Sequence, residues 1–284
     1  MLLPGMILLV LFNIVPYFGI IMAFENYNPG KGFLRSDFVG LDHFKDIFLI
    51  PECGQIFGNT IFISVMKIIA NILFPLLFAL LLNEVSFKFI KRSVQTVVYL
   101  PNFISWVILS AIFLDIFSYT GVINGIIKFF GGEPVLFLAS NGWFPFILIS
   151  TDVWKSYGFN AIVYLAALTS ISPMLYEAAI VDGASKLQQV RHISLPGLMP
   201  TIVLLATLAL GNIMNANFDQ VFNMYNPIVY KSGDIIDTYV YRQGIQNMQY
   251  GFATAVGLLK SVVSVVLIAA SYKLAARFAN YRIF

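Results

Sequence analysis

Four charged side chains lie inside long apolar stretches of this sequence, where an ionised group is costly. They are Lys67, Asp152, Lys155 and Lys260. In a membrane helix such groups usually pair with each other or face a cavity. Asp152 and Lys155 are three residues apart, so on a helix they either pair or line a path together. Lys260 is a further path candidate, whereas Lys67 lies one turn before Asn71, which favours a hydrogen-bonded contact between helices.

A second set of residues has the composition of a ligand pocket, which mixes aromatic faces with a few oriented polar groups. Asn212, Asn215 and Asp219 recur at helical spacing, so a continuous helix would place them on one face, followed by Phe222. The other candidates are Trp154, Tyr157, Asn160, Tyr164 and Tyr225. Asn and Asp also join membrane helices, and Trp and Tyr also anchor them at the interface, so both interpretations stay open.

Other kinds of chemistry find little support. The single cysteine, Cys53, excludes an internal disulfide and a cysteine-based metal cluster, and His43 and His192 are far apart in the sequence. No phosphate loop of the form G-x-x-x-x-G-K-[ST] occurs, so we expect the chain itself to bind no ATP. The net charge of +3 is too small to argue for nucleic acid. We therefore expect no catalytic residue, no metal and no cofactor in this chain.

A polar stretch, EAAIVDGASKLQQVRHISLP, interrupts the apolar sequence at residues 177–196. Ser172 followed by Pro173 predicts a helix start, with the serine as N-cap. Asp182-Gly183 predicts a break, after which Asp182 caps a second short helix from about residue 184 to residue 192. Leu195-Pro196 is expected to stop that helix and return the chain to the membrane.

This stretch has the composition of a docking site for another protein. Its small residues permit close approach of a partner, and they are Ala178, Ala179, Gly183 and Ala184. Leu187 and Val190 offer apolar anchors, and Glu177, Lys186 and Arg191 offer charges, as when a helix docks in a groove. The alternative is a loop that only links two spans.

The elements that position these residues must be membrane helices. Of 284 residues, 59% are hydrophobic and only 11% are charged, against about 25% charged in soluble domains. A bilayer core needs about 20 apolar residues of helix. Six stretches qualify, roughly residues 2–24, 57–82, 94–117, 143–168, 198–216 and 252–274. The expected fold class is an all-α polytopic membrane protein. No basic leader or cleavage site precedes the first span, so we expect no cleavable signal. The sequence opens almost inside that span, so we expect the natural chain to begin earlier.

Basic residues indicate the orientation of the spans. One set of loops and the C-terminal tail are mainly basic, with Lys88, Lys91, Arg92, Lys186, Arg191, Lys273, Arg277 and Arg282. The longer loops on the opposite side are mainly acidic. We therefore expect the stretch at residues 177–196 and both termini to be cytoplasmic.

On the outer side, residues 40–48 predict a short helix with Asp42 as N-cap and with Phe44, Ile47 and Phe48 on one face. This helix lies either on the outer leaflet or packed on the bundle. Residues 224–244 predict an ordered outer loop.

The spacing within residues 177–196 resembles the EAA loop of membrane subunits of ABC importers. The matching residues are Glu177-Ala178-Ala179, Gly183, Ile193 and Leu195-Pro196, with every interval kept. Asp182 and Ala184 flank the glycine in the form familiar from sugar importers. Leu187 and Val190 depart from the family, whose members often carry aromatic residues there. The resemblance implies a type I importer fold, with residues 173–196 as the contact to an ATPase.

The resemblance extends over nearly the whole chain. YLPNFISWVIL, DVWKSYGFNAIVYLAALTSI and FDQVFNMYNPIVYKSGDIIDTYVYRQG look like the oligosaccharide and polysaccharide branch of carbohydrate-uptake permeases, which includes the maltose-transporter permeases. It implies a heterodimer with a second permease, two ATPase subunits that bind ATP and Mg, and an extracytoplasmic solute-binding protein. It also divides the chain into residues 1–56, with the first span and outer loop, and a permease core at residues 57–284. Localisation in a bacterial inner membrane follows.

The resemblance leaves the substrate open. Three lysines against one aspartate inside the spans give a positive balance that suits an anionic sugar such as an oligouronate. The same lysines could instead have a structural role in an importer of neutral oligosaccharides. An ABC importer for a different solute and an ion-coupled secondary transporter remain alternatives, as does a non-transporting scaffold, which would not account for the polar residues at 212–219.

Overall fold

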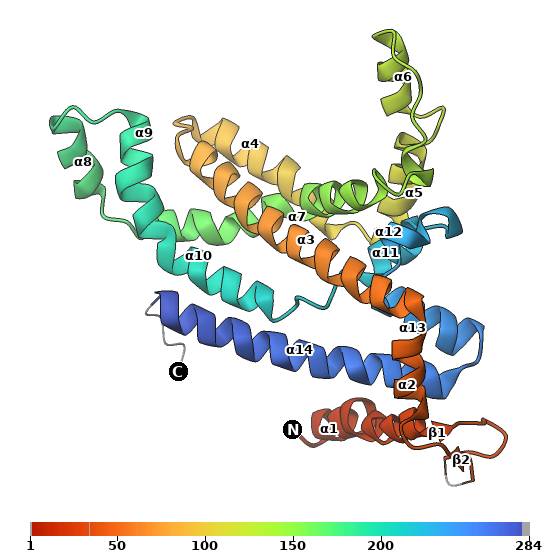
Figure 1. Ribbon diagram of the computed structural model, residues 1–284. Helices are drawn as coiled ribbons and strands as arrows, with labels where there is room; N and C mark the ends of the chain where they lie inside the picture. The colour runs from red at the N-terminus through yellow and green to blue at the C-terminus, as the bar shows by residue number, and fades with distance from the viewer. Residues whose placement is uncertain (1, 34, 280–284) are drawn as a thin grey trace. The chain divides into compact units, whose positions relative to one another are not determined.

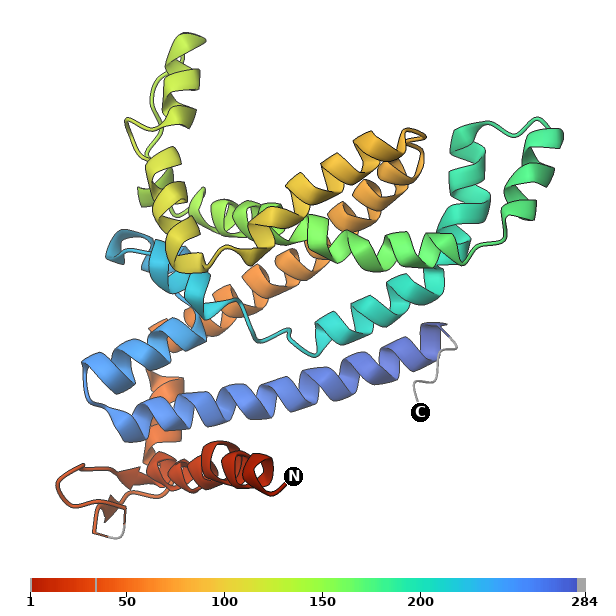
Figure 2. The same cartoon turned by 180° about the vertical axis from the view of Figure 1, so that it is seen from behind.

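The chain is almost entirely helical (Figures 1 and 2). The structure is a computed structural model that describes residues 2–33 and 35–279, with side chains described up to residue 273. Within these residues one short antiparallel pairing joins β1 (Glu25–Asn26) to β2 (Asp37–Phe38). Four described helices are long and apolar enough to cross a membrane, or up to six if two bent pairs each form one span. The architecture agrees with the expected all-α membrane fold.

Contacts divide the chain into two compact units, and each is described separately. The first combines Met1–Thr60 with Asp234–Val266, and the second combines Ile61–Gly233 with Leu267–Phe284. The sequence had suggested a division after residue 56 alone. The structure differs because the segment after residue 233 packs with the N-terminal part of the chain.

The first unit contains the N-terminal span and the outer segments. Its elements are α1 (Leu3–Leu9), the π turn η1 (Val10–Ile14), the 3-10 helix η2 (Val15–Phe24), α2 (Asp42–Leu49), α13 (Ile236–Tyr241) and the π turn η7 (Arg242–Gln246), with the start of α3 (Pro51–Asn83) and most of α14 (Tyr250–Ala279). The first span changes from α through π to 3-10 geometry near Pro16, whose ring clashes with the preceding turn and whose nitrogen donates no hydrogen bond.

The short helix predicted at residues 40–48 is present as α2, but its cap differs. Leu41 is the N-cap and Asp42 is the first helical residue, so Asp42 makes no capping hydrogen bond. Phe44 packs against Phe24 with ring centroids 5.6 Å apart, and Ile47 is buried. Phe48 remains 79% exposed. The helix therefore packs on its own unit through one side, and contact of Phe48 with lipid stays a prediction.

The second unit contains most of the remaining helices. Its elements are the larger part of α3, α4 (Lys88–Tyr99), η3 (Leu100–Phe103), α5 (Trp106–Ile116), α6 (Val122–Phe129), η4 (Phe137–Ala139), α7 (Phe144–Thr169), α8 (Pro173–Val181), α9 (Lys186–Gln189), the π turn η5 (Val190–Ser194), α10 (Leu195–Leu210), α11 (Phe218–Met224), η6 (Pro227–Val229) and α12 (Tyr230–Gly233). Tyr164 and Leu198 lie fully buried where α3, α7 and α10 pack together, and Ala79 and Ala161 let these helices approach closely.

The third predicted span, residues 94–117, is not one straight helix. The arm Lys88–Phe103 meets the arm Trp106–Ile116 at 102°. Pro101 lies in the last turn of the first arm, and Ser105 starts the second as its N-cap, accepting a hydrogen bond from the Ile108 backbone nitrogen at 3.5 Å. A proline followed by a capping serine therefore breaks the run that hydropathy alone had joined.

The fifth predicted span, residues 198–216, is also wrong at both ends. Helix runs without interruption from Lys186 to Leu210, and residues 211–217 are not helical. Asn217, with φ 71°, has a left-handed backbone and caps α11 by accepting a hydrogen bond from the Gln220 backbone nitrogen. Gly211 and the following asparagines are poor helix formers, and they end the helix before the polar residues that were expected on its face.

Candidate functional site

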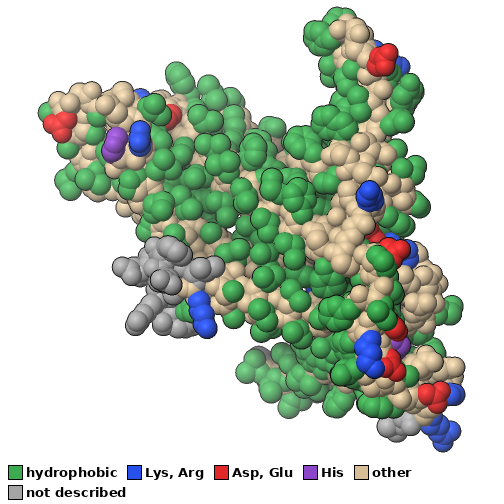
Figure 3. Space-filling view, viewed as in Figure 1, with side chains coloured by type: hydrophobic (Ala, Val, Ile, Leu, Met, Phe, Trp, Pro, Cys, Tyr) green, Lys and Arg blue, Asp and Glu red, His purple; other side chains and the backbone are tan. Residues whose placement is uncertain are grey.

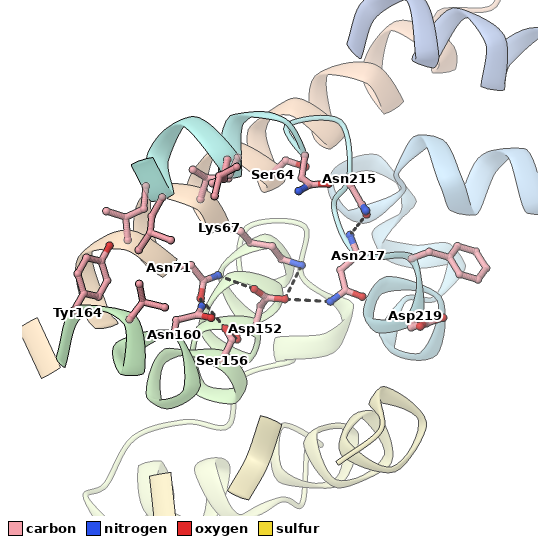
Figure 4. A pocket seen from close by; sticks show the side chains of 18 residues that line it. Ser64, Lys67, Asn71, Asp152, Ser156, Asn160, Tyr164, Asn215, Asn217 and Asp219 are labelled. Carbon is pink, nitrogen blue, oxygen red and sulfur yellow. Dashed lines mark hydrogen bonds and ion pairs between the residues drawn. The ribbon is translucent and has the colours of Figure 1, made fainter. Parts of the chain in front are cut away.

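A buried ion pair forms the floor of a polar cavity in the second unit (Figure 4). The Lys67 ammonium lies 3.6 Å from an Asp152 carboxylate oxygen. It also donates hydrogen bonds to the Ala216 backbone oxygen at 2.9 Å and to the Gln220 side-chain oxygen. Gln220 in turn donates to the Leu148 backbone oxygen at 2.7 Å. Lys67 is 6% exposed, and a charge this buried is tolerable only when it is paired and hydrogen-bonded.

Side-chain amides complete the coordination of the Asp152 carboxylate. It accepts hydrogen bonds from the Asn71 amide at 2.9 Å and from the Asn217 amide at 3.3 Å. The Asn71 oxygen accepts from the Ser156 hydroxyl at 2.6 Å and from the Asn160 amide at 3.5 Å. The network joins α3, α7 and the non-helical segment before α11. The hydrogen-bonded contact between helices that the Lys67 and Asn71 spacing predicted is therefore present, with Asp152 as the shared partner.

Lys155 does not pair with Asp152, contrary to one of the two expectations. Its ammonium donates to the Asn102 backbone oxygen at 2.7 Å and to the Pro101 backbone oxygen at 3.4 Å, and it lies 5.7 Å from the Trp106 ring centroid. These carbonyls end the arm Lys88–Phe103, where helical carbonyls lack partners within the helix. Lys155 therefore binds the bend between η3 and α5.

The cavity above the ion pair measures about 720 Å³. Its polar wall is formed by Ser64, Lys67, Asn71, Asp152, Ser156, Asn160, Tyr164, Asn212, Asn215, Asn217 and Asp219, and its apolar wall includes Ile68, Ile72, Val163, Leu205, Leu208, Ala209 and Phe218. Figure 4 shows these side chains converging from α3, α7, α10 and the segment that leads into α11.

Three exposed polar residues in the wall remain available to a ligand. In the part of the chain that the structure describes, the side chains of Asn212 and Asp219 make no hydrogen bond or ion pair, and Asn215 uses only its oxygen, which accepts from the Asn217 backbone nitrogen at 3.2 Å. All three residues are exposed. They are the residues that the sequence had placed on one helical face; they reach the cavity from a non-helical segment and the first turn of α11 instead.

The other candidates for a path residue lie outside the cavity wall. Trp154 packs edge-on against Phe113 at 5.5 Å between ring centroids, and Tyr157 packs edge-on against Phe78 at 5.4 Å. Tyr225 contacts the rings of Phe222 and Tyr230. In the first unit, the Lys260 ammonium lies 2.5 Å from an Asp237 carboxylate oxygen.

The expected positive balance inside the spans is not found in the cavity. Lys67 is neutralised by Asp152, Lys260 pairs with Asp237 in the other unit, and Lys155 binds backbone carbonyls. The wall of the cavity contains one lysine, two aspartates and no arginine. Counting charges along the spans could not reveal this, because Asp237 lies outside them.

A second candidate site is the polar segment at residues 172–196. α8 ends in a Schellman motif: the Gly183 backbone nitrogen donates to the Ile180 oxygen at 3.0 Å, and the Ala184 nitrogen donates to the Ala179 oxygen at 2.8 Å. Gly183, at φ +77°, supplies the left-handed residue that this motif needs, and a Cβ there would meet nothing within 4 Å. The sequence had predicted both a break at Asp182-Gly183 and close approach of a partner at the glycine; the structure accounts for the break, and the close approach stays a prediction.

Three details of this segment differ from expectation. Ser172 precedes α8 but makes no capping hydrogen bond with its side chain. Ser185, not Asp182, caps α9, in a capping box with Gln188. Leu195-Pro196 does not end the helix, because the π turn η5 places the Leu195 backbone nitrogen on the Val190 oxygen, five residues back, and carries the helix past the proline.

The expected docking residues divide into an exposed group and a packed group. Leu187 is 78% exposed, and Glu177, Ala178, Asp182, Arg191 and Pro196 are also exposed. Lys186 pairs with Glu84 at 3.0 Å. Ala179, Ala184 and Ile193 are half-buried. Val190 and Leu195 pack on the core around Tyr164 and Leu198, so Val190 is not a free anchor.

Comparison with known proteins assigns the chain to a family. Residues 71–280 match the family described as binding-protein-dependent transport system inner membrane component. The chain belongs to this family. Together with the relatives below, this result confirms the expected family of importer permeases, and with the structural comparison it confirms the expected fold class. The chain is therefore a membrane-spanning subunit of a transport system.

Relatives and solved structures cover nearly the full length of this inner membrane component. It is 39% identical over 279 residues to Protein LplB of Bacillus subtilis, covering 98% of this chain and 88% of the relative. It is 39% identical over 285 residues to YteP of the same organism, a polygalacturonan/rhamnogalacturonan transport system permease, covering 100% and 89%. A crystal structure of a bacterial ABC transporter that imports the acidic polysaccharide alginate contains a similar chain, with TM-score 0.89 and 38% identity, covering 98% of this chain and 94% of that one.

Sequence reasoning missed several residues of the site in this transport component. Ser64, Ser156, Asn217 and Gln220 lie in the cavity wall or its floor network and were not predicted. A signal existed for Asn217, since the run of asparagines after Gly211 predicts a helix end. Ser64 and Gln220 had none, because each reaches the site only through packing of distant helices.

Proposed function

We propose that this chain forms half of the translocation path of an ATP-driven oligosaccharide importer. The observation that carries the proposal is the polar cavity, in which Asn212, Asn215 and Asp219 are free to bind a ligand. Amide and carboxylate groups are suited to sugar hydroxyls, and Phe218, whose ring stacks on Phe222, adds apolar surface to the same wall. The floor network holds this wall in one geometry before substrate arrives, which favours binding.

The substrate class that we propose is an oligosaccharide, with oligouronates as the first candidates. The relatives named for polygalacturonan/rhamnogalacturonan transport and for alginate import support acidic sugars. The cavity supports binding through hydroxyls, because its one cation is already paired and Asp219 repels a carboxylate. An oligouronate would therefore bind with its carboxylates turned away from Asp219.

Coupling to ATP is assigned to residues 173–196. The EAA spacing and the exposed apolar side chains of Val181 and Leu187 support docking onto a cytoplasmic ATPase subunit, which would bind ATP and Mg. A second permease would complete the path, and a solute-binding protein would deliver the sugar from outside. Alginate pentasaccharide-bound periplasmic protein is present in one solved complex of a similar transporter. The orientation with both termini cytoplasmic rests on the loop charges.

The helix from Lys186 to Leu210 supports a direct mechanical route. It begins with α9 in residues 173–196, which we call the docking segment. It ends with Leu205, Leu208 and Ala209 in the cavity wall. The capping box at Ser185 and the 3.0 Å hydrogen bond between Tyr176 and Ser194 hold its start as a unit. Closing of the ATPase subunits would then move the cavity wall along with α9, shifting the protein between inward-open and outward-open states.

Sugar uptake by the reconstituted importer tests this proposal. Asn212→Ala, Asn215→Ala and Asp219→Asn each remove a group that can bind a hydroxyl, so we expect about tenfold weaker apparent affinity for the sugar. Asn13→Ala, an exposed asparagine of the first span, is the matched control and leaves uptake unchanged. Wild-type affinity in all three cavity variants would show that the substrate does not use this cavity.

Two further measurements decide the finer points. Competition between acidic and neutral oligosaccharides of equal length tests the substrate class, and preference for the neutral sugar would contradict the oligouronate assignment. Uptake that survives ATP depletion but stops when the ion gradient is dissipated would favour an ion-coupled transporter. Co-purification with an ATPase subunit would support the importer directly.

A further inference from the structure

The first turn of α4 contains a cluster of cations that the cavity and the docking segment leave unused. Lys88, Lys91 and Arg92 lie within five residues, and we call them the basic patch. In the part of the chain that the structure describes, no carboxylate forms an ion pair with any of them. The nearest acidic residue in sequence, Glu84, is already paired with Lys186. Three cations this close together repel one another unless an anion neutralises them.

Large apolar side chains surround the basic patch. Phe87 is 73% exposed and Phe89 is 83% exposed, and Ile90 beside them is 49% exposed. Cations mixed with exposed aromatic and aliphatic groups are typical of segments at the boundary between lipid headgroups and acyl chains. In water alone the apolar groups would stay exposed to solvent at a cost in free energy. In hydrocarbon the cations would lose their hydration without gaining a partner.

The position in the chain places the basic patch at the end of a span. It follows closely on the apolar helix α3, and the arm Lys88–Phe103 that continues from it is one half of a bent helix pair that could form one span. Hydrophobic side chains form broad patches in the view of Figure 3, which is typical of a surface that faces lipid or other subunits. Lysine and arginine at the end of such a span extend their long side chains to the headgroup level.

We propose that the basic patch binds the headgroup of an anionic phospholipid. The phosphate would neutralise the three cations, and Phe87, Phe89 and Ile90 would contact the upper acyl chains. The assignment to the cytoplasmic leaflet rests on the orientation in the proposed function. The lipid would hold the turn between α3 and α4 next to Glu84, the partner of Lys186 in the docking segment; the turn and α9 lie side by side in Figures 1 and 2.

Lipid retention tests the proposal. The full-length chain, purified with the subunits that accompany it, is exchanged into micelles containing phosphatidylcholine and phosphatidylglycerol in equal amounts, and bound lipid is counted by native mass spectrometry. Each cation contributes roughly fivefold to binding at an anionic surface, so Lys88→Gln, Lys91→Gln and Arg92→Gln together weaken phosphatidylglycerol binding on the order of 100-fold. High salt lowers retention by the wild-type protein for the same reason.

Two control variants accompany the measurement. Lys31→Gln, Arg35→Gln and Lys45→Gln together remove as many cations from the outer loop, where Lys31 and Lys45 already pair with Asp37 and Asp42, and this variant retains phosphatidylglycerol. Lys88→Arg, Lys91→Arg and Arg92→Lys keep the charge and also retain it. Equal retention of the two lipids by the wild-type protein would overturn the proposal, as would full retention by the glutamine variant. The proposal would also be overturned if the glutamine variant kept its lipid but lost a co-purifying subunit. Counting bound lipid does not require transport, so the result is valid whether or not the importer proposal is correct.

Discussion

At the scale of single residues, the site depends on one buried charge pair. Lys67 and Asp152 lie 85 positions apart on different helices, and their pairing could not be read from the sequence because only the packing of α3 on α7 brings them together. The sequence had offered Lys155 as the local partner, three residues away. Lys155 instead binds backbone carbonyls at the bend after η3. Hydropathy did not reveal this helix end, because the apolar run continues across the bend.

Removing one member of this pair is predicted to be worse than removing both. Lys67→Met leaves the largely buried Asp152 carboxylate without its cation, at a cost of about 3–5 kcal/mol. Lys67→Met combined with Asp152→Asn removes both charges, so we expect it to be more stable than the single variant. Apparent melting temperatures of the detergent-purified proteins measure the coupling. Equal destabilisation by the single and the double variant would contradict a charge-based role.

At the scale of elements, most helices could be predicted and most of their ends could not. Apolar length located the helices, because lipid requires long runs of apolar residues with internally satisfied backbones. The end of α10 was missed because Asn212, Asn215 and Asp219 fit a helical period, yet Asn212 and Asn215 lie in a non-helical segment and Asp219 lies in the next helix, α11. The helix through Pro196 was missed because a π turn can carry a helix past a proline, and no sequence pattern announced it.

Close packing between α4 and α7 depends on Gly158. A Cβ at this position would overlap the Val98 backbone oxygen and carbonyl carbon. Gly158→Ala is therefore predicted to push α4 away from α7 and to destabilise the protein by about 1–3 kcal/mol. Gly257→Ala in α14, where a Cβ would meet nothing within 4 Å, is the matched control and is expected to leave stability unchanged or slightly raised. Similar melting temperatures for the two variants would refute this account of the α4–α7 contact.

The turn between α8 and α9 depends on Gly183 for its left-handed backbone. Gly183→Ala forces a Cβ into that conformation at a cost of about 1 kcal/mol, whereas Gly183→Asn is tolerated better because asparagine adopts it more readily. We expect stimulation of the partner ATPase by the loaded binding protein to fall with alanine and to persist with asparagine. If asparagine is the more harmful of the two, the larger side chain blocks a partner, and close approach explains the glycine.

At the scale of the whole molecule, the two candidate sites are linked by one helix. The docking segment contains α9, and the cavity wall contains the last turns of α10, and helix is continuous from Lys186 to Leu210. The sequence pointed to both candidate sites but separated them at Leu195-Pro196, where it predicted a stop. In the proposed function this continuity matters, because a shift of α9 would be transmitted along the helix to the cavity wall.

Softening this helix is predicted to uncouple ATP hydrolysis from uptake. Met199→Gly with Thr201→Gly introduces two glycines midway between the docking segment and the cavity, each lowering helix stability by about 1 kcal/mol. Met199→Ala with Thr201→Ala removes the same side chains and keeps strong helix formers on both sides of Pro200, so it serves as the control. We expect the glycine variant to hydrolyse ATP with fewer sugars imported per ATP, and the alanine variant to keep the wild-type ratio, both measured in proteoliposomes. An unchanged ratio in the glycine variant would mean that α10 does not transmit the motion, and that the cavity wall is moved through α3 or α7 instead.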